Sequence, residues 1–191
     1  MIGTFCHRGK TFKANLSRPL DISVPIRAGE KGVQAWYVPP VKMEPVRTEH
    51  FLGSVAEGGD VNFRNVSFNP HGHGTHTECV GHIAQEVHSI NQVLRSFFSH
   101  AYVHSLTPEK IDGDRVITLN TLKKIDLDGA ESLCLRTLPN APEKLSMDYS
   151  DTNPAYMSLD AMQWVIDNGI KHLLLDVPSV DREKDGGELA A

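Results

Sequence analysis

Apolar residues follow two different spacings along this chain. Short runs in which they adjoin or alternate with polar residues predict β-strands, and stretches in which they recur three or four positions apart predict helices. Strands are therefore expected at residues 21–26, 61–68, 101–106, 116–118, 131–137 and 171–176. Helices are expected at residues 90–98, 119–124 and 158–168. This mixture, neither strictly alternating nor segregated, predicts a mixed α/β (α+β) fold.

The helix expected at residues 158–168 has the most regular pattern. Ser158 is a suitable N-cap, and Gly169 is suited to end the helix. Four apolar residues are expected to form its buried stripe: Leu159, Met162, Val165 and Ile166. In the strand expected at residues 131–137, Leu133 and Leu135 should share one face, because side chains alternate along a strand.

Two segments rich in proline and polar residues are expected to be irregular. Residues 30–50 contain Pro39, Pro40 and Pro45, which withhold the backbone donor that a sheet requires, and an extended arm is expected there. Residues 138–157 are expected to form a long surface loop.

Composition and charge narrow the class of protein. A chain of 191 residues, 40% hydrophobic and 23% charged, fits a single globular domain over residues 1–191. A net charge of −5 without a dense Lys/Arg run argues against nucleic acid as a partner. No apolar run reaches the roughly 20 residues needed to cross a membrane. The three cysteines form no CxxC motif, so reduced thiols and a cytoplasmic location are expected.

A dense group of histidines carries the candidate chemistry. Residues 69–82 read Asn-Pro-His-Gly-His-Gly-Thr-His-Thr-Glu-Cys-Val-Gly-His. Imidazoles and carboxylates are the usual ligands of Zn²⁺ and of harder ions such as Mn²⁺. The interspersed glycines allow the backbone to turn tightly enough for close neighbours to face one point. A divalent metal, Zn or Mn, is therefore the expected cofactor.

The spacing within this group suggests which side chains bind the metal. On an extended segment residues two apart point the same way, so His76 and Glu78 can address one ion. His71 or His73 can supply a third ligand, and His82 can reach the same neighbourhood. Three protein ligands with an open position describe a catalytic site, where the metal lowers the pKa of bound water to about 7 and polarises a carbonyl oxygen. With a free histidine as acid/base, this predicts hydrolysis of an amide, an ester or a similar compound.

Part of the group is similar to a known family signature. Gly74-Thr-His-Thr-Glu78 with His82 resembles the His-x-Gly-Thr-His-x-Asp-x-Pro-x-His signature of the cyclase family, whose best-known activity is the metal-dependent kynurenine formamidase reaction. Further similar segments follow the family's order: Asp21-Ile-Ser, Leu135-Arg-Thr137 and Leu175-Asp-Val-Pro-Ser-Val-Asp181. The resemblance covers nearly the whole chain. It implies a swivelling β/β/α domain, a small-molecule substrate and a homo-oligomer, dimer or tetramer, with sites close to subunit contacts.

The resemblance also implies roles for individual residues. His76 and Glu78 would be metal ligands, with Glu78 in place of the usual aspartate and able to bridge two ions. His82 would be a second-metal ligand or the catalytic acid/base group.

The chain departs from the family pattern in three places. The family's first histidine falls on Gly72, so the loop must adjust by one residue, and His71 is favoured over His73 as the first ligand. Val80 replaces the signature's proline. Family members continue beyond the Ser-x-Asp segment with a histidine and a glutamate that complete the metal site, so this chain is expected to lack the family's C-terminal segment.

The leading hypothesis is a metal-dependent hydrolase of a small amide, formamide, ester or lactone. One alternative is a cupin-like metal oxygenase, because His71-x-His73 followed by Glu78 also fits the His-x-His…Glu pattern of cupin barrels. Against it, the flanking glycines of that pattern are missing and helices are too frequent. A further alternative is a catalytically inactive metal-binding or scaffolding member of the cyclase family.

Overall fold

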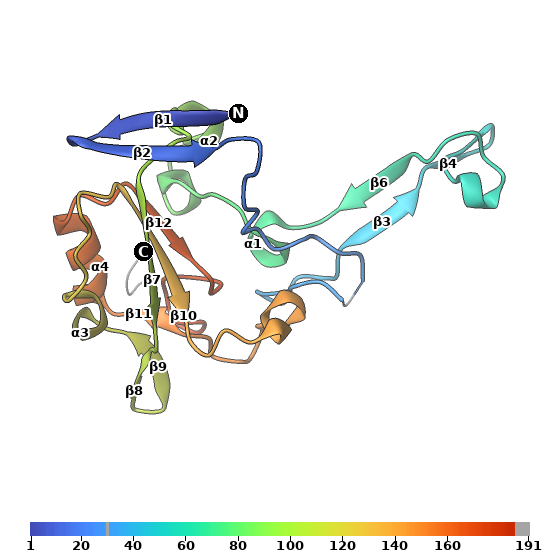
Figure 1. Cartoon of the computed structure of the whole chain (residues 1–191). Coiled ribbons are helices and arrows are strands. Elements are labelled where there is room, and N and C mark those ends of the chain that lie inside the picture. Colours follow the sequence, from blue (N-terminus) through green and yellow to red (C-terminus); the bar gives the residue numbers. More distant parts are fainter. Residues whose placement is uncertain (30, 186–191) are drawn as a thin grey trace. The chain divides into compact units, whose positions relative to one another are not determined.

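The computed structural model in Figure 1 describes residues 1–29 and 31–185. The chain folds into two compact units, each built from separate stretches of sequence. Unit 1 contains residues 1–22, 77–140 and the chain from Asn153 onward. Unit 2 contains residues 23–76 and 141–152.

The main sheet of unit 1 has three parallel strands in the order β12-β10-β7. Their bounds are Ala101–Leu106 for β7, Ser132–Thr137 for β10 and His172–Leu175 for β12. Leu133 and Leu135 of the central strand are 0% and 1% exposed, as their expected shared face requires. The strands expected at residues 101–106, 131–137 and 171–176 are confirmed.

Helix α4 (Leu159–Asp167) covers the buried face of this sheet, and the short helix α3 (Leu119–Leu122) lies against α4. Ser158 and Gly169 flank α4 as expected, although the Ser158 side chain makes no capping hydrogen bond. The expected stripe is wrong at Leu159 and Ile166, which are 64% and 63% exposed. Ala161 is buried in their place, because its small side chain lets the helix approach the sheet closely.

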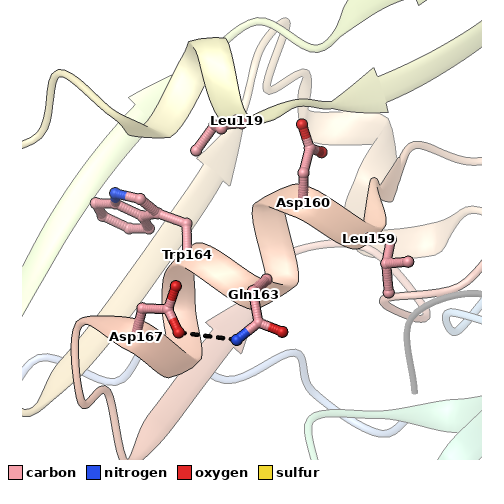
Figure 2. Close-up of a pocket in the computed structure, with 6 residues that line it drawn as sticks. All are labelled: Leu119, Leu159, Asp160, Gln163, Trp164 and Asp167. Carbon is pink, nitrogen blue, oxygen red and sulfur yellow. Dashed lines mark hydrogen bonds between the residues drawn. The ribbon is translucent and has the colours of Figure 1, made fainter.

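The outer surface of α4 is hollowed by a shallow pocket of about 460 Å³ (Figure 2). Its apolar part is formed by Leu119, Leu159 and Trp164. Gln163 donates a hydrogen bond of 2.8 Å to Asp167 across one turn of the helix. None of the expected metal ligands lines this pocket.

Smaller elements complete unit 1. A second sheet has the order β11-β9-β8, and an N-terminal hairpin pairs β1 with β2. The bounds are β1 Ile2–His7, β2 Lys10–Asn15, β8 Glu109–Ile111, β9 Asp114–Ile117 and β11 Tyr156–Met157. The helical turns are η2 Val80–His82 and α2 Ile90–Val93. No helix in the described ranges is long and apolar enough to span a bilayer.

Unit 2 is built around a two-stranded antiparallel ribbon, β3 with β6. The strands of this unit are β3 Lys42–Pro45, β4 Arg47–Thr48, β5 Phe51–Leu52 and β6 Arg64–Ser67. Its helical turns are η1 Val55–Glu57, α1 Pro70–His73 and η3 Pro142–Ser146. The arm expected at residues 30–50 is thus only partly irregular, because β3 and β4 form within it.

Several predicted elements are absent or shortened. Only β6 forms within the strand expected at residues 61–68, and the helix expected at residues 119–124 ends at Leu122. No strand forms at residues 21–26, where Pro25 withholds a ladder donor and Ile22 is 73% exposed. The helix expected at residues 90–98 ends at Val93, and Phe97 and Phe98 are 76% and 87% exposed. Without an apolar face to pack on, a helix of this length is marginal. The mixed α/β (α+β) fold class is confirmed.

Candidate metal centre

Helix α1 orients the first candidate ligand in unit 2. The Asn69 side-chain oxygen accepts hydrogen bonds from the backbone N–H groups of His71 (2.9 Å) and Gly72 (3.3 Å). Pro70 occupies the first helical position, where no backbone donor is needed. An asparagine cap followed by proline therefore starts a helical turn that carries His71 at its second residue.

His73 returns the same kind of contact. Its Nδ1 accepts a hydrogen bond of 2.9 Å from the Asn69 backbone N–H, so the two side chains cap the turn reciprocally. Because Nδ1 is an acceptor, the hydrogen of the neutral ring lies on Nε2. Nε2 is buried, without a hydrogen-bond partner among the described residues, in a side chain that is 2% exposed. Neither nitrogen of the His73 ring therefore has a lone pair available to a metal ion, which favours His71 over His73 as the first ligand.

His76 lies next to His71 in unit 2. The two rings meet edge to face with centroids 5.0 Å apart. The His76 Nδ1 lies 2.8 Å from the Gly74 carbonyl oxygen, to which it can donate. With Nδ1 as the donor, Nε2 is the acceptor nitrogen of the ring, the tautomer that ligating histidines usually have.

Gly72 is required by a close contact. A Cβ at this position would lie 2.5 Å from Val38 Cγ2 and 3.0 Å from the Ala35 carbonyl oxygen. A histidine here, at the position of the family's first histidine, would collide with the Val38 side chain and crowd the Ala35 carbonyl oxygen. The adjustment of the loop to His71 follows from this packing.

The ligands expected in unit 1 are Glu78, two residues before η2, and His82, the last residue of η2. His82 Nε2 is 3.7 Å from Glu78 Oε1, and both side chains are roughly half exposed, 49% and 40%. The turn of η2 brings these residues together although they are four positions apart. A Cβ on Gly81 would lie 2.3 Å from the His88 carbonyl oxygen, so only glycine allows this approach. The Cys79 thiol donates to the same oxygen at 3.4 Å, consistent with the expectation that it is not a ligand.

Three of the four predicted ligands qualify together as candidates for holding one metal ion: His71, Glu78 and His82. They offer two imidazole nitrogens and a carboxylate oxygen, a donor set that suits Zn²⁺ or Mn²⁺. His76, the fourth, is not in this group and contacts His71 instead. Sequence reasoning missed the role of Asn69, which the Asn-Pro pair before the histidines could have signalled.

The second region similar to the family signature lies where two parallel strands of unit 1 end. Thr137, the last residue of β10, donates to the Asp176 carboxylate through its backbone N–H (3.0 Å) and its hydroxyl (2.9 Å). Burial raises the pKa of the nearby Cys134 thiol, and the negative charge of Asp176 raises it further to a smaller extent. Cys134 therefore stays protonated near neutral pH and is not an activated nucleophile. Ligand sites of open α/β sheets commonly form at this end of the strands.

The fold and the family comparison agree on the class of protein. The parallel sheet does not fit a cupin, whose barrel is built from antiparallel sheets. Comparison with curated proteins finds no match. The model of the Cyclase family, described as "Putative cyclase", matches residues 16–182, which include every candidate ligand and the strand ends at Thr137 and Asp176. The chain belongs to this cyclase family.

Proposed function

We propose that this protein is a metal-dependent hydrolase acting on a small amide, formamide, ester or lactone. The observation that carries the proposal is the donor group of His71, Glu78 and His82 in a member of the cyclase family. A site with no more than three protein ligands leaves coordination positions for water and substrate, as catalytic rather than structural sites do.

The proposed metal is Zn²⁺ or Mn²⁺, held by His71 and Glu78, with His76 beside His71. When bound, such an ion lowers the pKa of water and polarises a carbonyl oxygen. The reciprocal caps of Asn69 and His73 would hold His71 in place before the ion arrives. The hydrogen bond to Gly74 would set the orientation of the His76 ring.

His82 is the proposed acid/base group. Its imidazole is half exposed, so solvent can reach it, and histidine is the side chain that most often acts as a general acid or base. In hydrolysis it would take a proton from the attacking water and give one to the leaving nitrogen or oxygen. Glu78, 3.7 Å away, would stabilise the imidazolium that forms in between.

Metal content and turnover, measured on the same preparations, test the proposal. The full chain is purified, analysed for bound metals, and assayed on panels of arylformamides, esters and lactones before and after chelation. We expect chelation to abolish turnover and Zn²⁺ or Mn²⁺ to restore it. Full turnover by metal-free protein would rule out this mechanism.

Variants separate the roles of the residues. His71→Ala and Glu78→Gln should lose metal and turnover together. His82→Ala should retain metal and lose turnover if it is the acid/base group, whereas loss of metal would make it a ligand. His50→Ala is the matched control, because its side chain is 86% exposed and it lies outside the candidate group.

A further inference from the structure

The β3–β6 ribbon of unit 2 has one polar face and one apolar face. In the antiparallel register, Lys42 lies opposite Ser67 and Glu44 opposite Asn65, on the polar face. Met43 lies opposite Val66 on the other face, where Arg64 and Phe68 also project because side chains alternate along β6. Val66 is 53% exposed and Phe68 is 46% exposed. The apolar face is therefore only half covered.

The ribbon is also incomplete as a sheet. It consists of two strands, and no third strand pairs with either of them in the described part of the chain (Figure 1). Two-stranded ribbons are marginally stable in water, and three or more strands with an apolar face are usually needed. A further strand is the natural complement of such a ribbon.

The two outer edges of the ribbon differ. The backbone N–H of Val46 bonds to the Phe63 carbonyl oxygen at 2.9 Å, so by the alternation of antiparallel ladders the backbone groups of residues 43 and 45 point away from β6. On that edge Pro45 has no donor, and the Val41 carbonyl oxygen already accepts from Gly29. Proline on an edge strand is a common protection against pairing.

The edge of β6 has no such protection. The same alternation directs the backbone groups of Arg64 and Val66 outward, and those of Phe68 if the strand is continued by one residue. Residues 61–69 contain no proline. The Arg64 side chain makes no hydrogen bond or ion pair within the described residues, and it stands in the strand as an available cation.

We propose that β6 pairs antiparallel with β6 of a second copy of this chain, centred on Val66. In this register Val66 faces Val66 of the partner subunit, and Arg64 faces Phe68 of the partner subunit. Each arginine would then lie over an aromatic ring, a favourable cation–π arrangement. Asn65 would face Ser67 of the partner subunit on the polar side. The strand is thus complementary to itself, which favours a second copy over an unrelated partner.

The resulting sheet would have four strands, β3-β6-β6-β3, with its apolar face continuous across the two-fold axis. Phe68 is followed directly by Asn69, the cap of the turn that carries His71. The contact between subunits would therefore lie one residue from the network that orients a proposed metal ligand. It is independent of catalysis and can be tested without substrate or metal.

A charge exchange tests the register. Phe68→Arg places the introduced arginine opposite Arg64 of the partner subunit, and Arg64→Glu places a carboxylate opposite Phe68. We expect the wild type to sediment as a dimer or a multiple of it, and each variant alone to dissociate with a constant raised roughly tenfold or more. In the equimolar mixture, the new glutamate faces the new arginine and the native arginine faces the native phenylalanine. The mixture should therefore recover the wild-type mass.

Phe97→Arg is the matched control, because it adds the same charge at a 76% exposed phenylalanine of unit 1. It should leave the mass unchanged. Recovery in the mixture shows that the single variants fold. Hydrogen exchange of the wild type gives a readout without substitution: amides of Arg64 and Val66 should become protected as concentration rises, while those of Asn65 and Ser67 stay protected throughout. A wild type that remains monomeric, or variants that associate like the wild type, would overturn the proposal.

Discussion

The two units differ in what they bury. In unit 1, one continuous cluster between the main sheet, α3 and α4 is buried, and Ile117, Leu122 and Leu133 have no exposed surface. In unit 2, the ribbon exposes Val66 and Phe68, while the imidazole of His73 is 2% exposed. Unit 1 thus has a continuous apolar core, whereas the described part of unit 2 buries a histidine and only three apolar residues, Ala35, Val41 and Tyr149.

This difference indicates what stabilises each unit. Burial of apolar surface contributes about 25 cal/mol per Å², so the cluster in unit 1 can hold that unit together by itself. The stability of unit 2 is expected to depend more on local hydrogen bonds, such as those of Asn69 and His73, and on a bound ligand or partner. A ligand or a partner that binds the folded form adds stability by mass action.

The largest expected effect is on the core of unit 1. Leu133→Ala should lower the free energy of unfolding by about 2–5 kcal/mol, because it leaves a cavity in a fully buried cluster. Val55→Ala in unit 2, where the side chain is 52% exposed, should cost about 0.5 kcal/mol or less. Denaturant unfolding followed by circular dichroism measures both. Equal losses would show that the units are not stabilised differently.

The next effect concerns the caps. Asn69→Ala removes two hydrogen bonds at the start of α1 and should cost about 1 kcal/mol of stability. It should also weaken metal binding about tenfold, since groups that orient ligands typically contribute that much. Asn69→Asp keeps the acceptor and should restore both. Ser158→Ala removes an N-cap residue that makes no capping bond, so a smaller loss is expected. Metal titration and thermal unfolding provide the measurements.

A smaller effect depends on pH and belongs to unit 1. Hydrogen bonds from Asn153 and Tyr156, with the charge of Arg182, hold the pKa of Asp114 below its ordinary value. A lowered folded-state pKa gives stability that is complete above the unfolded value of about 3.9 and is lost as pH falls through the folded value. Asp114→Asn should therefore flatten the loss of stability between about pH 5 and pH 2. Glu49→Gln, with an 88% exposed side chain, should not.

The smallest effect separates two thiols of unit 1. Cys6 is exposed, whereas burial raises the pKa of Cys134. Cys134 should react with a thiol reagent roughly tenfold more slowly than Cys6. Mass spectrometry of the labelled peptides gives both rates. Equal rates would mean that the sheet face carrying Cys134 opens readily to solvent.

Elements with a regular pattern and a core to pack on were predictable. The strand with Leu133 and Leu135 and the helix at residues 159–167 formed where periodicity placed them. The buried face of that helix was not predictable, because Ala161 is only weakly hydrophobic and its sequence position does not indicate close packing. The N-terminal hairpin was missed as well. Its strands, β1 and β2, have little apolar alternation and are joined by Arg8 and Gly9, both with positive φ.

The candidate site was predictable in its chemistry and less so in its detail. The density of histidines around Glu78 indicated a metal. The choice between His71 and His73 depended on which ring is buried and what its Nδ1 accepts, and spacing alone carries no such information. The same holds for Gly81, whose need arises from the His88 carbonyl oxygen seven residues further along the chain.

The unequal edges of the ribbon have a consequence for assembly. Once two copies join through β6, the only strands left at the rim of the shared sheet are the two copies of β3. There Pro45 offers no hydrogen and the Val41 carbonyl oxygen is already occupied by Gly29. Addition of a third molecule through this sheet would find only Met43 with both backbone groups directed outward, which is too little for a ladder. Growth by this route would stop at a closed dimer. The difference between the β6 and β3 edges would therefore allow one partner to bind and oppose the growth of fibres through this sheet.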